Sequence, residues 1–221
     1  MAHNVVVNEV LSLTHDVKRI RTSKPKGYEF TPGQATEVSL NKQGFEDEKR
    51  PFTFTSLPSE DHLEFVIKSY FDHDGVTKQI DAIREGDELL IDDAWGAIEY
   101  KGKGIFIAGG AGITPFISIF RDLYEHGKIG DNKLIYSNKT GKDVILEPFW
   151  QEILGENFTS TLTREKIEGH DHGRITMDYL GDRIDDFSQH FYVCGPDEMV
   201  KNITGLLKQL GASPEGLVFE E

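Results

Sequence analysis

The chain has a single cysteine, Cys194, among its 221 residues. One thiol cannot form a disulfide within the chain, and it cannot provide the several thiolates that an iron–sulfur cluster or a cysteine zinc site needs. We therefore expect a protein of a reducing compartment, the cytoplasm.

Long apolar runs and positive charge are also scarce. No run approaches the roughly 20 apolar residues of a membrane-spanning helix, and the first ten residues, MAHNVVVNEV, lack the pattern of a signal peptide. With 24 Lys and Arg against 38 Asp and Glu, the net charge is −14. Such a charge repels nucleic acid and anionic membranes, so we expect no nucleic-acid binding and no membrane insertion.

Metal-ligand spacing is missing as well. The eight histidines include the stretches DHDG, Asp72 to Gly75, and HDHG, His170 to Gly173. Both are typical of surface turns, and neither has a spaced partner on a regular element. We expect no metal site.

The sequence divides into two halves with different patterns. From Val5 to about Tyr100, short alternating runs are separated by turn-forming stretches, which predicts an antiparallel β-barrel or sandwich. From about Lys103, apolar runs lead through turns into helical patterns, which is typical of a parallel α/β sheet. We expect two domains, residues 1–100 and 101–221, joined near the stretch EYKGKG.

The patterns also place individual elements. A helix should follow the run GIFIA, with Thr114 as its N-cap, Pro115 at its first position and Gly127 at its end. Another should follow HFYVCG, with Pro196 in its first turn and Gly211 at its stop. The expected strands are VVVNEVLSL, VKRIRTS, ATEVSL, RPFTFTS, LEFVIKSY, DELLIDD, GIFIA, KLIYS and HFYVCG, with a short helix over VTKQIDAI.

A glycine-rich turn, IAGGAGITP, opens the second half. A strand that leads through Gly110 and Gly112 into a helix gathers backbone N–H groups and the positive end of the helix dipole, which suits a pyrophosphate. Pro115 stands where a dinucleotide fingerprint usually has its third glycine. A plain tight turn between strand and helix is therefore the alternative interpretation.

The next strand end lacks the acidic residue with which NAD-binding enzymes commonly hold the ribose. Ser137 follows the strand instead, and Arg164 and Arg174 lie in the stretch LTREKIEGHDHGRI. Hydroxyl and guanidinium groups suit the 2′-phosphate of NADPH. The alternative is that these cations only balance an acidic surface.

Three motifs in this order resemble the ferredoxin–NADP reductase family: RPFTFTS, GGAGITP and CGP. The resemblance covers nearly the whole chain. It implies an antiparallel β-barrel flavin-binding domain, followed by an α/β parallel-sheet nucleotide-binding domain, with the flavin ring between them. On its own, RPFTFTS would be interpreted as an amphipathic strand.

RPFTFTS is similar to the flavin signature R-x-Y-S-x-x-S of that family, with Phe52 in place of the tyrosine. The resemblance implies that Arg50 contacts the FAD pyrophosphate, that the Phe52 ring packs on the flavin, and that the Thr53 hydroxyl forms a hydrogen bond near flavin N5. Pro51, between Arg50 and Phe52, belongs to the same FAD-binding segment. A cation, an aromatic plane and a small hydroxyl suit these three tasks.

Two more segments of the first half are implied to bind FAD: a strand end that lines the flavin chain, and a helix start that faces the pyrophosphate. These residues are Ile67, Lys68, Ser69, Gly75, Val76 and Thr77. In the second half, the resemblance places Thr114, Gly195 and Pro196 near the nicotinamide, where Cys194 would help to set the hydride angle. A buried cysteine without a functional role is the alternative.

The C-terminal GLVFEE lacks the final aromatic residue that shields the flavin in many relatives. The acidic residue of that tail would be Glu220, whose carboxylate could assist proton transfer, and a solvated tail is the alternative.

We therefore expect an FAD-containing reductase that takes hydride from NADPH or NADH. Its electrons would pass to a separate carrier, because the chain has no cysteines for a cluster, and the resemblance points to ferredoxin or flavodoxin. One alternative is a flavin-binding electron-transfer subunit of a larger complex with little activity alone. Another is an NAD(P)-dependent dehydrogenase without flavin.

Overall fold

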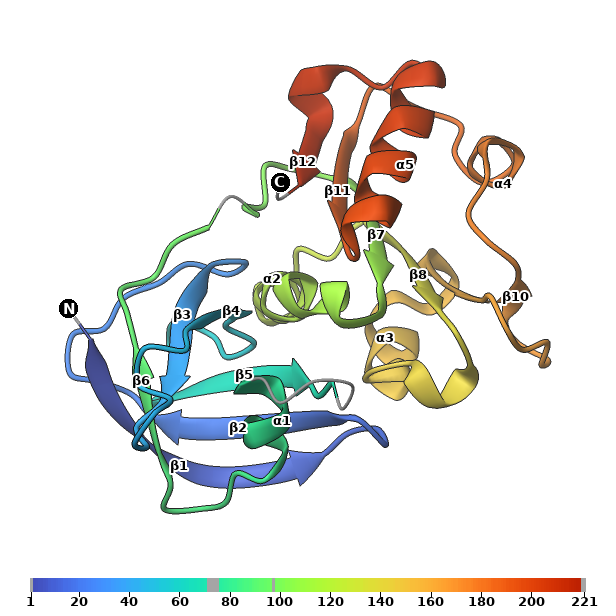
Figure 1. The fold of residues 1–221 in the computed structure, drawn as a ribbon. Helices are drawn as coiled ribbons and strands as arrows, with labels where there is room; N and C mark the ends of the chain where they lie inside the picture. Colours follow the sequence, from blue (N-terminus) through green and yellow to red (C-terminus); the bar gives the residue numbers. More distant parts are fainter. Residues whose placement is uncertain (1, 71–75, 97, 220–221) are drawn as a thin grey trace.

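A computed structural model describes residues 2–70, 76–96 and 98–219, with the backbone alone for residues 76–78. The first half forms an antiparallel sheet in the order β4-β3-β6-β1-β2-β5. A bridge between Phe54 and Phe65 brings its two edge strands together, so the sheet is a nearly closed barrel (Figure 1). Its elements are β1 (His3–Ser12), β2 (Val17–Ser23), β3 (Ala35–Leu40), β4 (Arg50–Thr53), β5 (His62–Lys68), α1 (Val76–Asp81) and β6 (Glu88–Ile91).

The barrel forms because its strands alternate. Side chains of successive residues point to opposite faces of a strand, so an apolar residue at every second position points into the barrel. Val5 and Val7 of β1, Ile20 of β2 and Val38 of β3 meet in one core in this way. The expected antiparallel barrel is confirmed.

The second half forms a six-stranded parallel sheet in the order β10-β9-β8-β7-β11-β12. Every residue of β7 is buried, as expected for a central strand covered on both faces. Its strands are β7 (Gly104–Gly109), β8 (Lys133–Asn138), β9 (Phe158–Leu162), β10 (Asp171–His172), β11 (His190–Cys194) and β12 (Leu217–Phe219). Its α-helices are α2 (Thr114–Glu125), α3 (Glu147–Leu154), α4 (Met177–Gly181) and α5 (Asp197–Gln209), and the 3₁₀ turns are η1 (Gly110–Ile113), η2 (Gly141–Asp143), η3 (Gly155–Asn157) and η4 (Pro214–Gly216).

One helix start differs from the prediction. The N-cap of α2 is Ile113, and Thr114 already has helical torsion angles, φ −59° and ψ −42°. The chain enters α2 from the 3₁₀ turn η1, so helical winding begins earlier than an N-cap at Thr114 would allow. The two predicted helix ends are found in the structure. Gly127 follows α2 with φ of +65°, and Gly211 follows α5 with φ of +102°.

Helix α2 joins the two domains. It lies between the barrel and the parallel sheet (Figure 1), and its apolar face shares one core with Val17, Val66 and Ile98 of the first half. Two polar contacts add to this core. The Gly33 N–H donates to Ser118 Oγ at 3.0 Å, and Arg121 donates to the Thr55 carbonyl at 2.8 Å. The helix that starts at the glycine turn is therefore fixed to the strand segment that follows β4.

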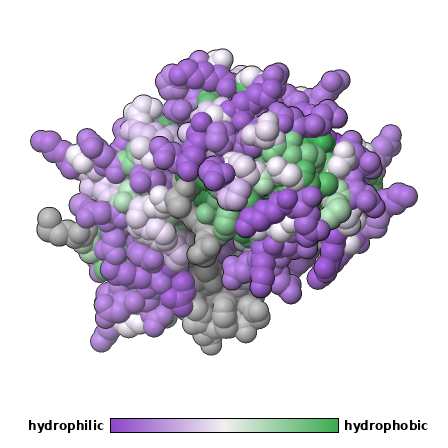
Figure 2. All heavy atoms as spheres, turned by 90° about the horizontal axis from the view of Figure 1, so that it is seen from above, coloured by the Kyte–Doolittle hydropathy of each residue, from purple (hydrophilic) through white to green (hydrophobic). Residues whose placement is uncertain are grey.

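The face seen from above is largely hydrophilic (Figure 2). Figure 2 shows polar side chains over most of the face seen from above, with hydrophobic atoms gathered in a limited region. Within the described residues, no helix is both long and apolar enough to cross a bilayer.

Candidate functional site: a cleft between the two domains

The glycine turn packs directly against the loop that follows β11. A Cβ atom on Gly112 would lie 2.4 Å from the Cys194 carbonyl oxygen, and one on Gly109 would lie 2.3 Å from Met199 Sδ. A Cβ atom on Gly195, in the opposite loop, would lie 3.1 Å from the Gly109 nitrogen. Only glycine allows two backbone loops to approach this closely. The contact brings the motifs GGAGITP and CGP together.

A buried tyrosine holds the glycine turn from below. Tyr136 of β8 donates its hydroxyl to the Gly110 carbonyl at 2.9 Å, and the Ile145 N–H lies 3.5 Å from the Tyr136 hydroxyl oxygen. Burial raises the pKa of Tyr136 far above its usual value, so the hydroxyl keeps its proton and remains a donor. Gly110, with φ of +53°, is thereby held in a left-handed conformation.

A pocket of about 490 Å³ lies over this turn, between the domains. It unites six residues that the sequence had suggested: Lys68, Gly110, Gly112, Ser137, Gly195 and Pro196. Its other lining residues are Tyr70, Gly109, Ala111, Asn138, Lys139, Asp143, Thr163 and Met199. The sequence offers one general signal for such residues: several of them lie where strands end, and ligands of parallel sheets bind at the carboxyl ends of strands.

A second pocket, of about 560 Å³, adjoins the first. The two share Ser137, Lys139, Thr163, Pro196 and Met199, so they form one continuous depression. Both predicted arginines, Arg164 and Arg174, line the second pocket, together with Ile175, Glu198, Asn202 and Ile203. The three cationic side chains at this end outnumber the one carboxylate, Glu198, which favours an anionic ligand group.

The predicted flavin strand is β4, an edge strand of the barrel. Arg50 and Phe52 share one face of it because side chains alternate, and Phe52 packs partly against the barrel core. Arg50 is half exposed, and its guanidinium donates to the Lys49 carbonyl at 2.6 Å and lies 3.7 Å from Glu48. Pro51 and Thr53 occupy the opposite face. None of these four residues is among the described lining of the two pockets.

The end of β5 has its own contacts. Ile67 belongs to the barrel core, and the Ser69 hydroxyl donates to Asp81 of α1 at 3.3 Å. Lys68 reaches the pocket and forms an ion pair of 2.7 Å with Asp16. Burial raises the pKa of Asp16, but Lys68, the Thr14 hydroxyl and His15 together outweigh it, so the pKa lies below its usual value.

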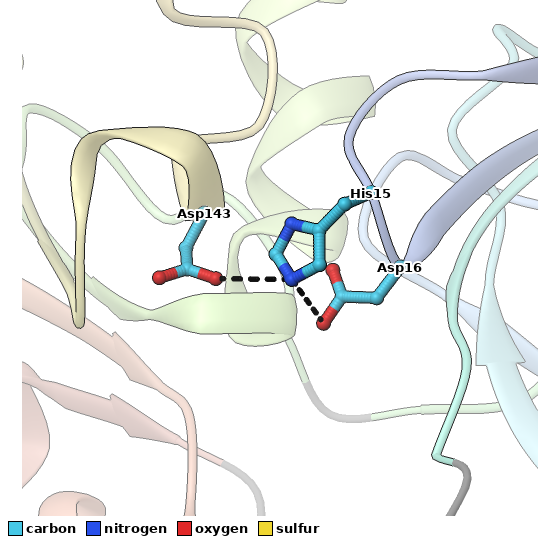
Figure 3. Close-up of side chains that lie close together, drawn as sticks. All are labelled: His15, Asp16 and Asp143. Carbon is cyan, nitrogen blue, oxygen red and sulfur yellow. Dashed lines mark ion pairs between the residues drawn. The ribbon is translucent and has the colours of Figure 1, made fainter.

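His15 links the two domains beside this ion pair. Figure 3 shows its imidazole between the carboxylates of Asp16, from the barrel, and Asp143, from η2. Its Nε2 atom lies 3.6 Å from Asp16 and 3.9 Å from Asp143. The ligand atoms of all three residues lie within 4.8 Å of one another, a spacing that a metal ion could bridge. Because Asp16 already pairs with Lys68, and Asp143 accepts from the Thr140 N–H and hydroxyl, we interpret the group as an ion-paired contact between domains.

The remaining predicted residues lie around the cleft or outside the described parts. Thr114 begins α2, and Cys194, partly buried, ends β11. Val76 and Thr77 begin α1, where only the backbone is described. Gly75 and Glu220 lie outside the described residues.

Both halves of the chain match known protein families. Residues 2–87 match the family model of an FAD-binding domain, and residues 106–204 match that of an oxidoreductase NAD-binding domain. Over 97% of its length, the chain is 27% identical to the reductase component of propane 2-monooxygenase from Rhodococcus jostii (strain RHA1). Over 93%, it is 25% identical to the ferredoxin–NAD(P)⁺ reductase component of a naphthalene 1,2-dioxygenase system from Pseudomonas putida. The chain covers 62% and 64% of these relatives, less than two thirds of their length.

Solved structures share the fold. A ferredoxin NADP⁺ reductase from Neisseria gonorrhoeae, determined with bound FAD and NADP, is 20% identical, with a TM-score of 0.86 over 99% of this chain and 98% of that one. The flavohem-like FAD/NAD binding domain of a nitric oxide dioxygenase from Vibrio cholerae is 18% identical, with a TM-score of 0.87 over 98% of this chain and 97% of that one. At these identities, the likeness concerns the two-domain architecture.

Proposed function

Since the chain belongs to the ferredoxin–NADP reductase-like flavoproteins, with an FAD-binding domain and an NAD-binding domain, we propose that it is an NAD(P)H-dependent reductase. It would take hydride from NADPH and pass electrons to a separate carrier. The observation that supports this best is the continuous pair of pockets that runs from the interdomain cleft, over the glycine turn, to the two arginines.

The residues of the first half fit an FAD that lies along β4. Arg50 is a half-exposed cation on the same face as the Phe52 ring, which suits a phosphate and an aromatic ring system respectively. Lys68 offers a second cation at the cleft, held in place by Asp16. FAD supplies the hydride-accepting ring, and the protein contributes binding and orientation. Thr53, Cys194 and Glu220 remain the proposed residues near the reacting atoms.

The residues of the second half fit a dinucleotide that crosses both pockets. The glycine turn lines the first pocket just ahead of the start of α2, so its backbone N–H groups and the helix dipole would stabilise a pyrophosphate there. The nicotinamide would then face the barrel, and the adenosine would reach the second pocket. Ser137, Lys139, Arg164 and Arg174 would contact a 2′-phosphate there, so we propose NADPH as the preferred donor.

The arginines provide a test of donor preference. The double variant Arg164→Ala and Arg174→Ala should raise KM for NADPH by about 10- to 100-fold, because the lost charge-assisted hydrogen bonds should cost about 1.5–3 kcal/mol in total. KM for NADH should change much less. Arg183→Ala is the matched control, since this arginine pairs with Asp171 in the same domain and lines neither pocket. Equal losses with both nucleotides would reject the preference.

The electron acceptor is proposed from the relatives. Two of them are named as reductase components of oxygenase systems, one with ferredoxin in its name. We propose ferredoxin, flavodoxin or another protein carrier as the acceptor, in the reducing cytoplasm that the single cysteine suggests.

The deciding experiment is an anaerobic titration of the purified protein with NADPH and, separately, NADH, followed by its visible spectrum. A flavin band that bleaches at a low ratio of NADPH would support the flavin, the donor and the preference together. A colourless protein that FAD cannot reconstitute would contradict the reductase proposal and favour the flavin-free dehydrogenase.

A second candidate is an electron-transfer subunit with little activity alone. It is favoured by one observation: the chain covers less than two thirds of relatives that are themselves named as components of larger systems. Size-exclusion chromatography of a native extract would separate the two. Elution near 24.9 kDa with full reductase activity would exclude the subunit interpretation.

A further inference from the structure

The side-chain amide of Asn138, the last residue of β8, is buried without a hydrogen-bond partner in the described part of the chain. It is only 5% exposed, and its backbone carbonyl accepts from the Thr163 N–H at 2.9 Å. Neither the oxygen nor the nitrogen of its side-chain amide has a hydrogen-bond partner among the described residues. A buried amide without partners is destabilising, and native proteins rarely keep one without a reason.

The neighbouring tyrosine does not satisfy this amide. Asn138 lies near enough to influence the Tyr136 hydroxyl, but the geometry between them is not that of a hydrogen bond. That hydroxyl instead donates to the Gly110 carbonyl and faces the Ile145 N–H. The Tyr136 hydroxyl therefore bonds the glycine turn and not the Asn138 amide.

Asn132, just before the start of β8, shows what a structural asparagine looks like in this fold. It is 1% exposed, and its oxygen accepts from the Gly104 N–H at 2.9 Å. Its nitrogen donates to the Ile129 carbonyl at 2.8 Å and to the Tyr100 hydroxyl at 3.1 Å. The two asparagines lie at opposite ends of one strand with similar burial, and of their two side chains only that of Asn138 has no partner among the described residues.

The position of Asn138 indicates what it could bind. It lines the interdomain pocket, and the preceding residue, Ser137, pairs with Gly109 across the sheet, so Asn138 lies beside the glycine turn. It is not among the described residues of the second pocket, where the arginines lie. The torsion that directs an asparagine amide is soft, so the amide can turn toward a ligand that enters the cleft.

We propose that Asn138 is a dinucleotide-binding residue whose amide hydrogen-bonds a ribose hydroxyl on the nicotinamide side. A hydroxyl both donates and accepts, which matches the two functions of an amide, whereas a pyrophosphate only accepts. The glycine turn already offers donors to the pyrophosphate. This inference rests on the proposed function, since it requires that a dinucleotide occupies the cleft.

The test compares Asn138→Leu with Asn132→Leu in the FAD-loaded full chain. Asn138→Leu removes the unpaired amide at similar volume, so Tm without nucleotide should stay equal or rise by about 2–4 °C. Its Kd for NADP⁺ should increase about tenfold. Asn132→Leu should lower Tm by several degrees, because it leaves the Gly104 N–H unpaired.

Adenosine 2′-phosphate provides a control ligand, because it is large enough only for the arginine end of the depression. Its Kd should be the same in wild type and Asn138→Leu. Where the leucine side chain prevents folding, Asn138→Ala gives the same readouts without added bulk.

Two results would overturn the inference. One is an unchanged NADP⁺ affinity in Asn138→Leu, and the other is a fall in Tm as large as that of Asn132→Leu, which would make the amide structural. A wild-type protein that binds neither NADP⁺ nor NAD⁺ would instead remove the proposed function, and this inference with it.

Discussion

At the scale of single residues, the glycine turn and the loop after β11 bring their backbones closest together at Gly112. Substitution by alanine should lower the free energy of unfolding by about 1–3 kcal/mol and weaken NADP⁺ binding, because the added methyl group would meet the Cys194 carbonyl. Urea denaturation and calorimetric titration measure the two effects.

Gly205, inside α5, is the matched control. Beyond its chain neighbours and the backbone of its own helix, no atom of the described residues lies within 4 Å of its Cβ position, so Gly205→Ala should stabilise the protein by about 0.5–1 kcal/mol. Equal effects of the two substitutions would show that the contact between the loops does not require glycine.

Asp16 should contribute to stability in a pH-dependent way. Its pKa in the folded protein lies below its usual value, so its contribution is present above the unfolded pKa of about 3.9 and is lost as pH falls through the folded pKa. The difference in unfolding free energy between wild type and Asp16→Asn should shrink from about pH 6 to pH 3. Asp185→Asn, at an exposed position, is the control substitution. A constant difference for Asp16→Asn would contradict the role of Lys68.

The sequence could predict some of these residues and not others. Ser137, Arg164 and Arg174 were recognisable because they follow strand patterns and carry phosphate-binding groups, and all three line one pocket. The contact of His15 with Asp143 joins positions far apart in the chain. No local pattern encodes such a contact, because it depends on how the two domains meet.

At the scale of elements, α2 should be sensitive to the loss of Arg121. Its guanidinium donates to the Thr55 carbonyl and to Glu60, and it lies 3.9 Å from the buried Glu64. Arg121→Ala should lower the unfolding free energy by about 1–3 kcal/mol and speed proteolysis in the linker near residues 99–104, because α2 would hold the barrel less firmly.

Arg183→Ala, again the control, breaks an ion pair within one domain. It should leave cleavage of the linker unchanged. If both arginine variants expose the linker equally, Arg121 has no special role at the domain contact.

Elements were predictable where apolar residues were periodic. The run GIFIA is apolar throughout and became the central strand β7. Strand β9 has the sequence FTSTL, whose three hydroxyl residues weaken the apolar signal, and it forms because β8 and β10 flank it. The start of α2 could not be placed from capping preference, since the preceding 3₁₀ turn determines it.

At the scale of the whole molecule, the net charge of −14 should govern the encounter with the acceptor. Reduction of an acidic flavodoxin should become faster as ionic strength rises from about 20 to 150 mM, because salt screens the repulsion. Reduction of a basic acceptor such as cytochrome c should become slower over the same range. An acidic carrier that reacts more slowly with added salt would indicate a local basic surface at the cleft that outweighs the total charge.

The shared core around α2 also bears on how such a chain could be divided or recombined. The two halves are separable in the sequence, yet Val17, Val66 and Ile98 lie in the same apolar cluster as the helix that begins the nucleotide-binding half. A gene cut between them would yield fragments that each expose one side of that cluster and recover a shielded surface only by reassociating. Exchange of one half for that of a distant relative would therefore require the face of α2, and the barrel residues opposite it, to be transferred together.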